Sequence, residues 1–345
     1  MKVSNMIIGL SICAVMAIAA TWLSGFQHYI GAPMLGLFLG IIVSNLWPAS
    51  AEVLKGTKYA SGKLLKFGII LAGSTLNFMS ILGVGMQALP LILFNICLSF
   101  TVALLIGRRL KTSTNTGILV GGGTAICGGT AIATLTSIIK AKEEEFAYAM
   151  AAIFFFDIFS AMMWPYFAVA MHLTPEQYGI LGGLAISDTA SVTAAGVTYD
   201  GLTQGAIGIS GMTGGQLAVV IKLVRTTMLI FVAMAAVIWV LHESKKSGST
   251  EQQVSMKEQM LKSFPYFVLG FLALAVCKTF GLIPASIAPW LSKGNKFFIT
   301  MALVGVGYKI KIKELFKKGL KPILLGGLTW LTVAASTLIY TLTMM

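Results

Sequence analysis

Long apolar runs, separated by short polar segments, dominate the chain. Residues 6–23, 88–106 and 228–241 are almost free of charge. A helix of about 20 such residues spans a hydrocarbon core roughly 30 Å thick. In lipid every backbone polar group must be satisfied within the protein, and these runs are too long and too uniformly apolar for barrel strands. The pattern therefore predicts an all-α integral membrane protein.

The apolar runs predict about eleven transmembrane helices. A hydrophilic stretch at 242–263, rich in Ser, Gln and Lys, is predicted to be a cytoplasmic linker. It divides the chain into a region of eight spans (1–241) and a region of three (264–345). The predicted spans are 6–22, 31–47, 64–83, 89–107, 116–139, 146–171, 177–198, 215–241, 264–280, 295–309 and 321–343.

Composition supports this class. Of 345 residues, 57% are hydrophobic and 11% are charged, whereas a soluble domain carries about 25% charged residues. The net charge of +13 could suggest nucleic acid, but the cations cluster in short loops between apolar runs, as the positive-inside rule describes. We therefore expect a lipid bilayer and no nucleic acid as partner.

The cations also predict an orientation. With the N-terminus in the cytoplasm, 18 Lys and Arg fall in cytoplasmic segments. Five fall on the opposite side: Lys140, Lys142, Lys278, Lys293 and Lys296. The N-terminus is thus predicted inside and the C-terminus outside. A cleavable signal peptide is the alternative for the first span, but residues 21–22 continue the helix.

A shift of 232 residues brings Pro33 onto Pro265, Gly73 onto Gly305 and Pro90 onto Pro322. In the predicted topology the two copies run in opposite directions, as in inverted-repeat transporters. Identity in this alignment is close to chance, so the repeat rests on the landmarks alone.

Four charged residues lie deep in predicted spans: Asp157, Asp188, Lys222 and Arg225. Charges at this depth cost several kcal/mol and mark binding or coupling sites. Lys222 and Arg225 are spaced i, i+3 on one helix face. The alternative is a structural ion pair with a snorkelling lysine.

Residues 121–130 hold five glycines and two threonines, which disfavour a continuous helix. A break at membrane depth survives where it is buried in protein or lines a cavity, and the helix start after it suits an anion. Close packing of small residues is the alternative. The predicted substrate contacts here are Thr124, Cys127, Gly128, Gly129 and Thr130.

A second polar cluster surrounds Asp188, where Ser187 and Thr189 are further candidate substrate contacts. Their hydroxyls could instead bond back to their own helix. Residues 211–216 indicate another helix start before Lys222. The sequence contains no HExxH, GxSxG or P-loop motif and no CxxC pair, so we expect neither an enzyme, a metal site nor a cofactor.

Several segments resemble the YeiH-like (UPF0324) membrane protein family, which carries a sulfate-exporter label. They are TAICGGTAIA at 124–133, IKAKEEE at 139–145, the segment 185–196, IKLVR at 221–225, FVLGF at 267–271 and LLGGLTW at 324–330. The resemblance covers nearly the whole chain. It departs at Ser187, where family members often carry His, and at Asp157, where they carry an uncharged residue.

The resemblance implies broken helices with unwound centres near the membrane midplane, in the inner membrane of a bacterium. It further implies a secondary transporter that exports sulfate, sulfite or a sulfonate. Lys222 and Arg225 would supply charge to the anion, and Asp188 or Asp157 would take up H⁺ or Na⁺ as coupling ion. A passive anion channel and a transporter of another small organic anion are the alternatives, and a homodimer is left open.

Overall fold

The computed structural model describes residues 2–26, 31–47, 50–247, 266–284, 286–309 and 320–343. Within them the regular structure is helical, apart from one isolated bridge between Ile207 and Thr213. The helices are α1 Lys2–Ser24, α2 Ala32–Leu46, α3 Ala51–Tyr59, η1 Ala60–Leu64, α4 Leu65–Ala72, η2 Gly73–Thr75, α5 Phe78–Arg109, α6 Thr114–Ala125, α7 Gly129–Ile139, α8 Glu143–Ala170, α9 Pro175–Ala185, α10 Thr189–Leu202, α11 Gly214–Thr227, α12 Leu229–Ser247, α14 Tyr266–Thr279, α15 Ala288–Gly307 and α17 Leu320–Thr343.

These elements confirm an all-α membrane protein. Five helical segments within the described residues are long and apolar enough to cross a bilayer: Met6–Ser24, Phe78–Arg109, Glu143–Ala170, Gly214–Val240 and Lys321–Thr343. The predicted linker begins later than expected, since α12 continues to Ser247. Residues 248–263 of that linker lie outside the described residues, as do His28 and Lys311, Lys313, Lys317 and Lys318.

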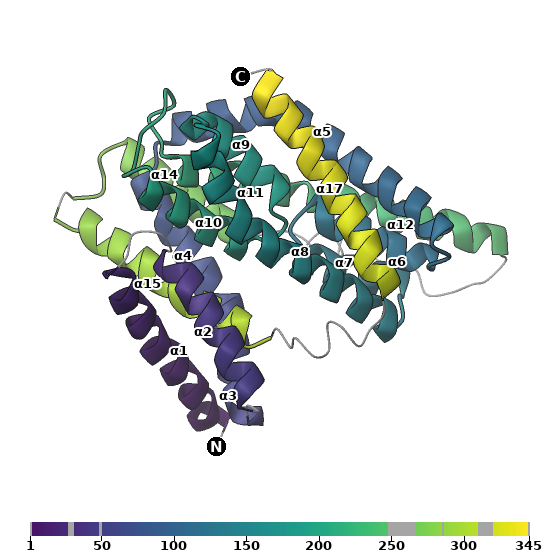
Figure 1. Cartoon of the computed structure of the whole chain (residues 1–345), viewed down its shortest axis with the longest axis horizontal. Helices are drawn as coiled ribbons and strands as arrows, with labels where there is room; N and C mark the ends of the chain where they lie inside the picture. Colours follow the sequence, from purple (N-terminus) through teal and green to yellow (C-terminus); the bar gives the residue numbers. More distant parts are fainter. Residues whose placement is uncertain are drawn as a thin grey trace.

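The helices form two groups that lie side by side (Figure 1). The first helix group comprises α1–α4, α14 and α15, and the second comprises α5–α12 and α17. Glycines let the first group pack closely, as where Gly9 of α1 meets Gly56 of α3 and Gly40 of α2 meets Gly307 of α15. Contacts between the groups are confined mainly to α10 against α2 and α15, and to α14 against α5.

Helices α6 and α7 form a helical hairpin, here called hairpin 1 (residues 114–139). Gly122 and Gly123 of α6 lie against Leu135 and Ile132 of α7, so the two arms pack antiparallel. The carboxylate of Glu145 accepts hydrogen bonds from Ser113 Oγ at 2.6 Å and from the backbone N–H of Lys142 at 2.9 Å. The residues before α6 and after α7 therefore lie at the same end of the molecule, called end A.

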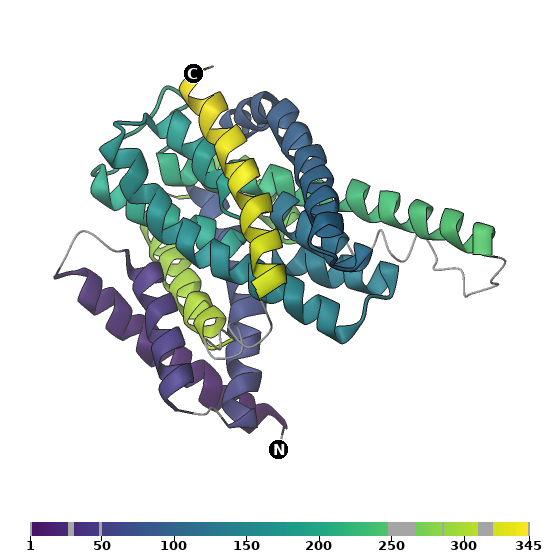
Figure 2. The same ribbon diagram turned by 45° about the vertical axis from the view of Figure 1, so that its right-hand side comes forward.

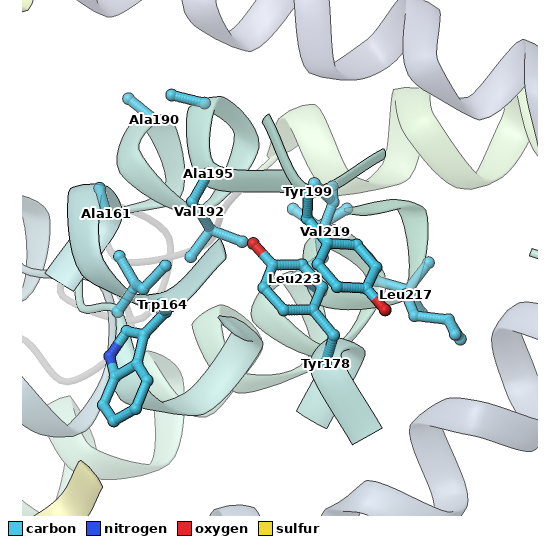
Figure 3. Packing of buried hydrophobic residues seen from close by; sticks show 14 of the residues in the cluster. Ala161, Trp164, Tyr178, Ala190, Val192, Ala195, Tyr199, Leu217, Val219 and Leu223 are labelled. Carbon is cyan, nitrogen blue, oxygen red and sulfur yellow. The ribbon is translucent and has the colours of Figure 1, made fainter. Parts of the chain in front are cut away.

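Helices α9 and α10 form a second hairpin, hairpin 2 (residues 175–202), at the opposite end of α8, called end B. The ring of Tyr178, near the start of α9, stacks on that of Tyr199, near the end of α10, with centroids 3.7 Å apart (Figure 3). Tyr199 Oη also donates to the carbonyl of Leu173 at 2.9 Å. The chain thus enters and leaves hairpin 2 at end B.

The two hairpins correct the predicted topology. Segments 116–139 and 177–198 were each predicted to cross the membrane, yet each returns to the end from which it entered. Arms of 11–14 residues are about 17–21 Å long and reach only part of the way through a bilayer. Lys140 and Lys142 consequently lie at end A with Arg108 and Arg109, and their predicted placement opposite these arginines was wrong.

The boundary between two predicted spans, 64–83 and 89–107, was also wrong. The first of these helices ends near Ala72, and α5 begins at Phe78. Asn77 caps α5, because its Oδ1 accepts the backbone N–H groups of Met79 and Ser80. Pro90 then lies inside α5 without ending it.

The hairpins create an inverted repeat. Hairpin 1 enters from end A and is followed by α8, which runs to end B. Hairpin 2 enters from end B and is followed by α11 and α12, which run back towards end A, where α12 extends beyond its neighbours (Figure 2). Helices α2 and α14, which the 232-residue shift pairs, also run in opposite directions. Gly31 at the start of α2 meets Thr198 at end B, whereas Thr279 at the end of α14 meets Phe78 there.

Candidate functional site

The tips of the two hairpins meet beside the middle of α8. Asp157 lies near the centre of Glu143–Ala170, and its Oδ1 accepts the backbone N–H groups of Ser187 and Asp188, both at 2.8 Å. Gly128, at the tip of hairpin 1, lies in van der Waals reach of Asp188 at the tip of hairpin 2. The predicted break at 121–130 and the polar cluster around Asp188 are thereby brought together.

Local chemistry explains both breaks. Gly128 has φ +62° and ψ −119°, a conformation that residues with a Cβ rarely adopt. In hairpin 2, Ile186 is extended, and the carboxylate of Asp188 caps α10 by accepting the N–H of Ala190 at 2.8 Å. The residues at each tip therefore favour the reversal of the chain there.

Arg225 joins the two tips. Its side chain is 2% exposed, and Nε donates to the carbonyl of Ala125 at 2.6 Å. Nη1 donates to the carbonyl of Leu184 at 2.6 Å, and Nη2 donates to that of Thr124. These carbonyls end the first arms of the two hairpins, where the helix dipole favours a cation.

Lys222 completes this arrangement one turn earlier on α11. Its Nζ donates to the carbonyl of Ile186 at 2.6 Å, and Trp330 Nε1 of α17 donates to the neighbouring carbonyl of Ala185 at 3.0 Å. The carbonyls freed by both breaks are thus satisfied from within the protein, as the membrane interior requires. Both cations that were predicted to bind an anion donate hydrogen bonds to backbone carbonyls.

The remaining predicted site residues lie at different depths around the tips. Ser187, Thr189 and Cys127 are buried, and Thr124 is 1% exposed with no hydrogen-bond partner for Oγ1 among the described residues. Gly129 is half-buried, and Thr130 is exposed in the first turn of α7.

Asp188 differs from the other three intramembrane charges. Asp157, Lys222 and Arg225 are each 2% exposed or less, while Asp188 is half-buried. It lies on the α10 side of hairpin 2, the helix that meets α2 and α15 of the first group. Of the four, Asp188 is therefore the most exposed.

A cavity of about 900 Å³ lies between the two helix groups at end B. It is bounded near end B by Ser24 and Gly205 and extends to Thr193, whose hydroxyl bonds to the carbonyl of Thr189 one turn away. The cavity thus leads along α10 towards the hairpin tips.

Sequence reasoning did not identify the charged lining of this cavity. Lys293 and Lys296 of α15 line one side, and Asp200 of α10 lines the other. Both lysines had been counted only as loop cations. Their i, i+3 spacing at the start of an otherwise apolar helix was the signal that could have found them.

The predicted helix start at 211–216 is confirmed. Thr213 caps α11, with its Oγ1 near the N–H of Gln216 and the Gln216 side chain accepting the N–H of Thr213. Asp200 binds the same turn, since its carboxylate accepts from Thr213 Oγ1 at 2.7 Å and from Gly215 N at 2.8 Å. The described residues hold no cluster of three His, Cys, Asp or Glu side chains suited to a metal.

Several known proteins are similar to this chain over nearly its whole length. A family model described as "Conserved hypothetical protein 698" matches residues 8–326. A UPF0324 membrane protein of Streptococcus pneumoniae is 32% identical over 334 residues, covering 96% of this chain and 95% of the relative. A UPF0324 membrane protein of Fusobacterium nucleatum is 30% identical over 344 residues, covering 96% of both chains. One of Streptococcus pyogenes is 33% identical over 336 residues, covering 96% and 95%.

Proposed function

The chain belongs to the UPF0324 membrane protein family, and from this membership and the hairpin geometry we propose that it is a secondary transporter of a small anion. One observation carries the proposal: two hairpins entering from opposite ends meet beside α8, and a cavity between the two helix groups leads along α10 towards their tips. Opposed elements of this kind allow a central site to face either side in turn.

The sparse contact between the helix groups supports movement of one against the other. Arg225 binds the tips of both hairpins and so links them within the second group. The second group would then move as one body, carrying the tips past the first group. Sulfate, sulfite and sulfonates are the proposed substrates, with export as the direction, on the family resemblance.

The tips supply the proposed transport site. Thr124 Oγ1 has no hydrogen-bond partner in the part of the chain that the structure describes, and Ser187 and Thr189 lie on the adjacent tip. Lys222 and Arg225 would contribute positive potential from behind the backbone, since each already donates to a backbone carbonyl. Asp188 is the proposed coupling residue for H⁺ or Na⁺. Asp157 would hold the tip of hairpin 2 in place.

We also propose that end A is cytoplasmic. Moving Lys140 and Lys142 to end A changes the predicted tally from 18 against five to 20 against three, which strengthens the positive-inside bias. Replacing two membrane crossings by hairpins removes an even number of crossings. The two termini therefore still lie on opposite sides of the membrane, and the C-terminus stays outside.

The test is uptake by liposomes that contain the purified protein. Preloaded unlabelled sulfate should accelerate entry of labelled sulfate, and Asp188→Asn should abolish acceleration by a proton or Na⁺ gradient while leaving exchange measurable. Lys278→Gln, an exposed change at end B outside the cavity lining, serves as control. Uptake that neither saturates nor responds to preloading would indicate a passive channel instead.

A further inference from the structure

The cavity at end B carries charges of both signs on facing walls. Lys293 and Lys296 belong to α15 of the first helix group, and Asp200 belongs to α10 of the second. Both lysines are exposed. The ammonium of Lys296 makes no hydrogen bond or ion pair of 4 Å or less with a described residue, while that of Lys293 lies 5.5 Å from the Trp290 ring centroid. Neither ammonium is therefore held in a direct ion pair within the described residues.

The walls between these charges are largely apolar. Ile69, Val197, Val219 and Ile299 contribute to the lining, and Thr198 and Thr300 add hydroxyls. A cavity of about 900 Å³ lies in the range usual for organic ligands of drug size. A bare tetrahedral oxyanion would fill little of it and would leave the apolar walls unused.

Asp200 also has a structural role. Its two oxygens each accept one hydrogen bond, from Thr213 Oγ1 and Gly215 N, and so anchor α10 to α11. An ionised carboxylate has about four lone-pair positions. Each oxygen of Asp200 therefore keeps acceptor capacity for a donor in the cavity.

From this arrangement we propose that the cavity binds a short organic acid that also carries an amino group. The acid group would lie against Lys293 and Lys296, the ammonium against Asp200, and the carbon chain against the apolar wall. This deepens the proposed function, on which it rests, because it makes an amino-sulfonate or amino-carboxylate, rather than an inorganic anion, the ligand held in the cavity at end B.

The test is calorimetric titration of the purified full-length protein with taurine, ethanesulfonate and sulfate. Taurine should bind roughly tenfold or more tightly than ethanesulfonate, which has the same acid group and no ammonium. Lys296→Gln should weaken both organic ligands. Asp200→Asn, which keeps an acceptor for Thr213, should weaken taurine alone and bring its affinity to that of ethanesulfonate.

The two variants separate recognition from folding. A purely structural Asp200 would change both organic ligands equally when replaced, and that result would overturn the proposal. So would equal binding of taurine and ethanesulfonate, or equal losses in Lys296→Gln and the control Lys278→Gln. If sulfate binds and taurine does not, this inference fails while the proposed anion transporter stands; sulfate exchange in liposomes reports on the latter separately.

Discussion

Arg225 donates through Nε to the carbonyl of Ala125 at 2.6 Å, although the two residues are 100 positions apart. The bond joins the last turn of α11 to the tip of hairpin 1, and another donor of the same guanidinium reaches the tip of hairpin 2. A planar cation with five N–H groups suits such a junction better than an ammonium does.

Replacing Arg225 should therefore destabilise the protein. In Arg225→Ala several buried carbonyls lose their donor, and each such loss costs about 1–3 kcal/mol. We expect a total of at least roughly 3 kcal/mol, with Arg225→Lys intermediate, measured by thermal unfolding in detergent. The exposed Lys278→Ala should stay within about 0.5 kcal/mol of the wild type. A stable Arg225→Ala protein would show that the junction does not hold the tips.

Asp157 should tolerate loss of its charge better than loss of its oxygen. Asp157→Asn keeps an acceptor for the N–H groups of Ser187 and Asp188, whereas Asp157→Leu leaves both unpaired. We expect Asp157→Leu to cost about 2–4 kcal/mol more than Asp157→Asn in the same unfolding measurement. Equal stability of the two variants would contradict the assignment. Loss of gradient-driven uptake in a folded Asp157→Asn protein would instead place proton coupling there.

The tip of hairpin 1 should require glycine at position 128. Its φ of +62° makes Gly128→Ala strained by about 1–3 kcal/mol. Gly83 offers a matched control, since it lies inside α5 and a Cβ there meets nothing within 4 Å. Gly83→Ala should be neutral or stabilise by up to about 1 kcal/mol. Similar melting temperatures for the two variants would argue against the strained tip.

The hairpin topology predicts which residues a membrane-impermeant thiol reagent reaches from each side. In a background without Cys97 and Cys277, Arg109→Cys and Lys142→Cys should be labelled from the same side. Ile209→Cys should be labelled from the other, since its loop binds Glu176 at end B through Ser210. A continuous span at 116–139 would place Arg109 and Lys142 on opposite sides, and that labelling pattern would refute hairpin 1.

The amino-acid sequence was sufficient to predict the membrane class and to single out four intramembrane charges. Apolar runs identify helices because a bilayer leaves the backbone no other partner, and Asp157, Asp188, Lys222 and Arg225 stand out because charge is costly there. The glycine-rich break was visible for the same reason: glycine disfavours a continuous helix wherever the helix lies. These properties are local, so a single chain reveals them.

The path of the chain through the membrane depends on tertiary packing. A broken apolar segment of 24 residues has the same composition whether it continues across or turns back; the packing of Gly122 against Leu135 and the shared carboxylate of Glu145 distinguish the two. Likewise, the hydrogen-bond acceptors of Arg225 could not be inferred from the sequence, because every residue carries a backbone carbonyl. Which carbonyls lose their helical partners, and which cation lies beside them, depends on how distant segments pack.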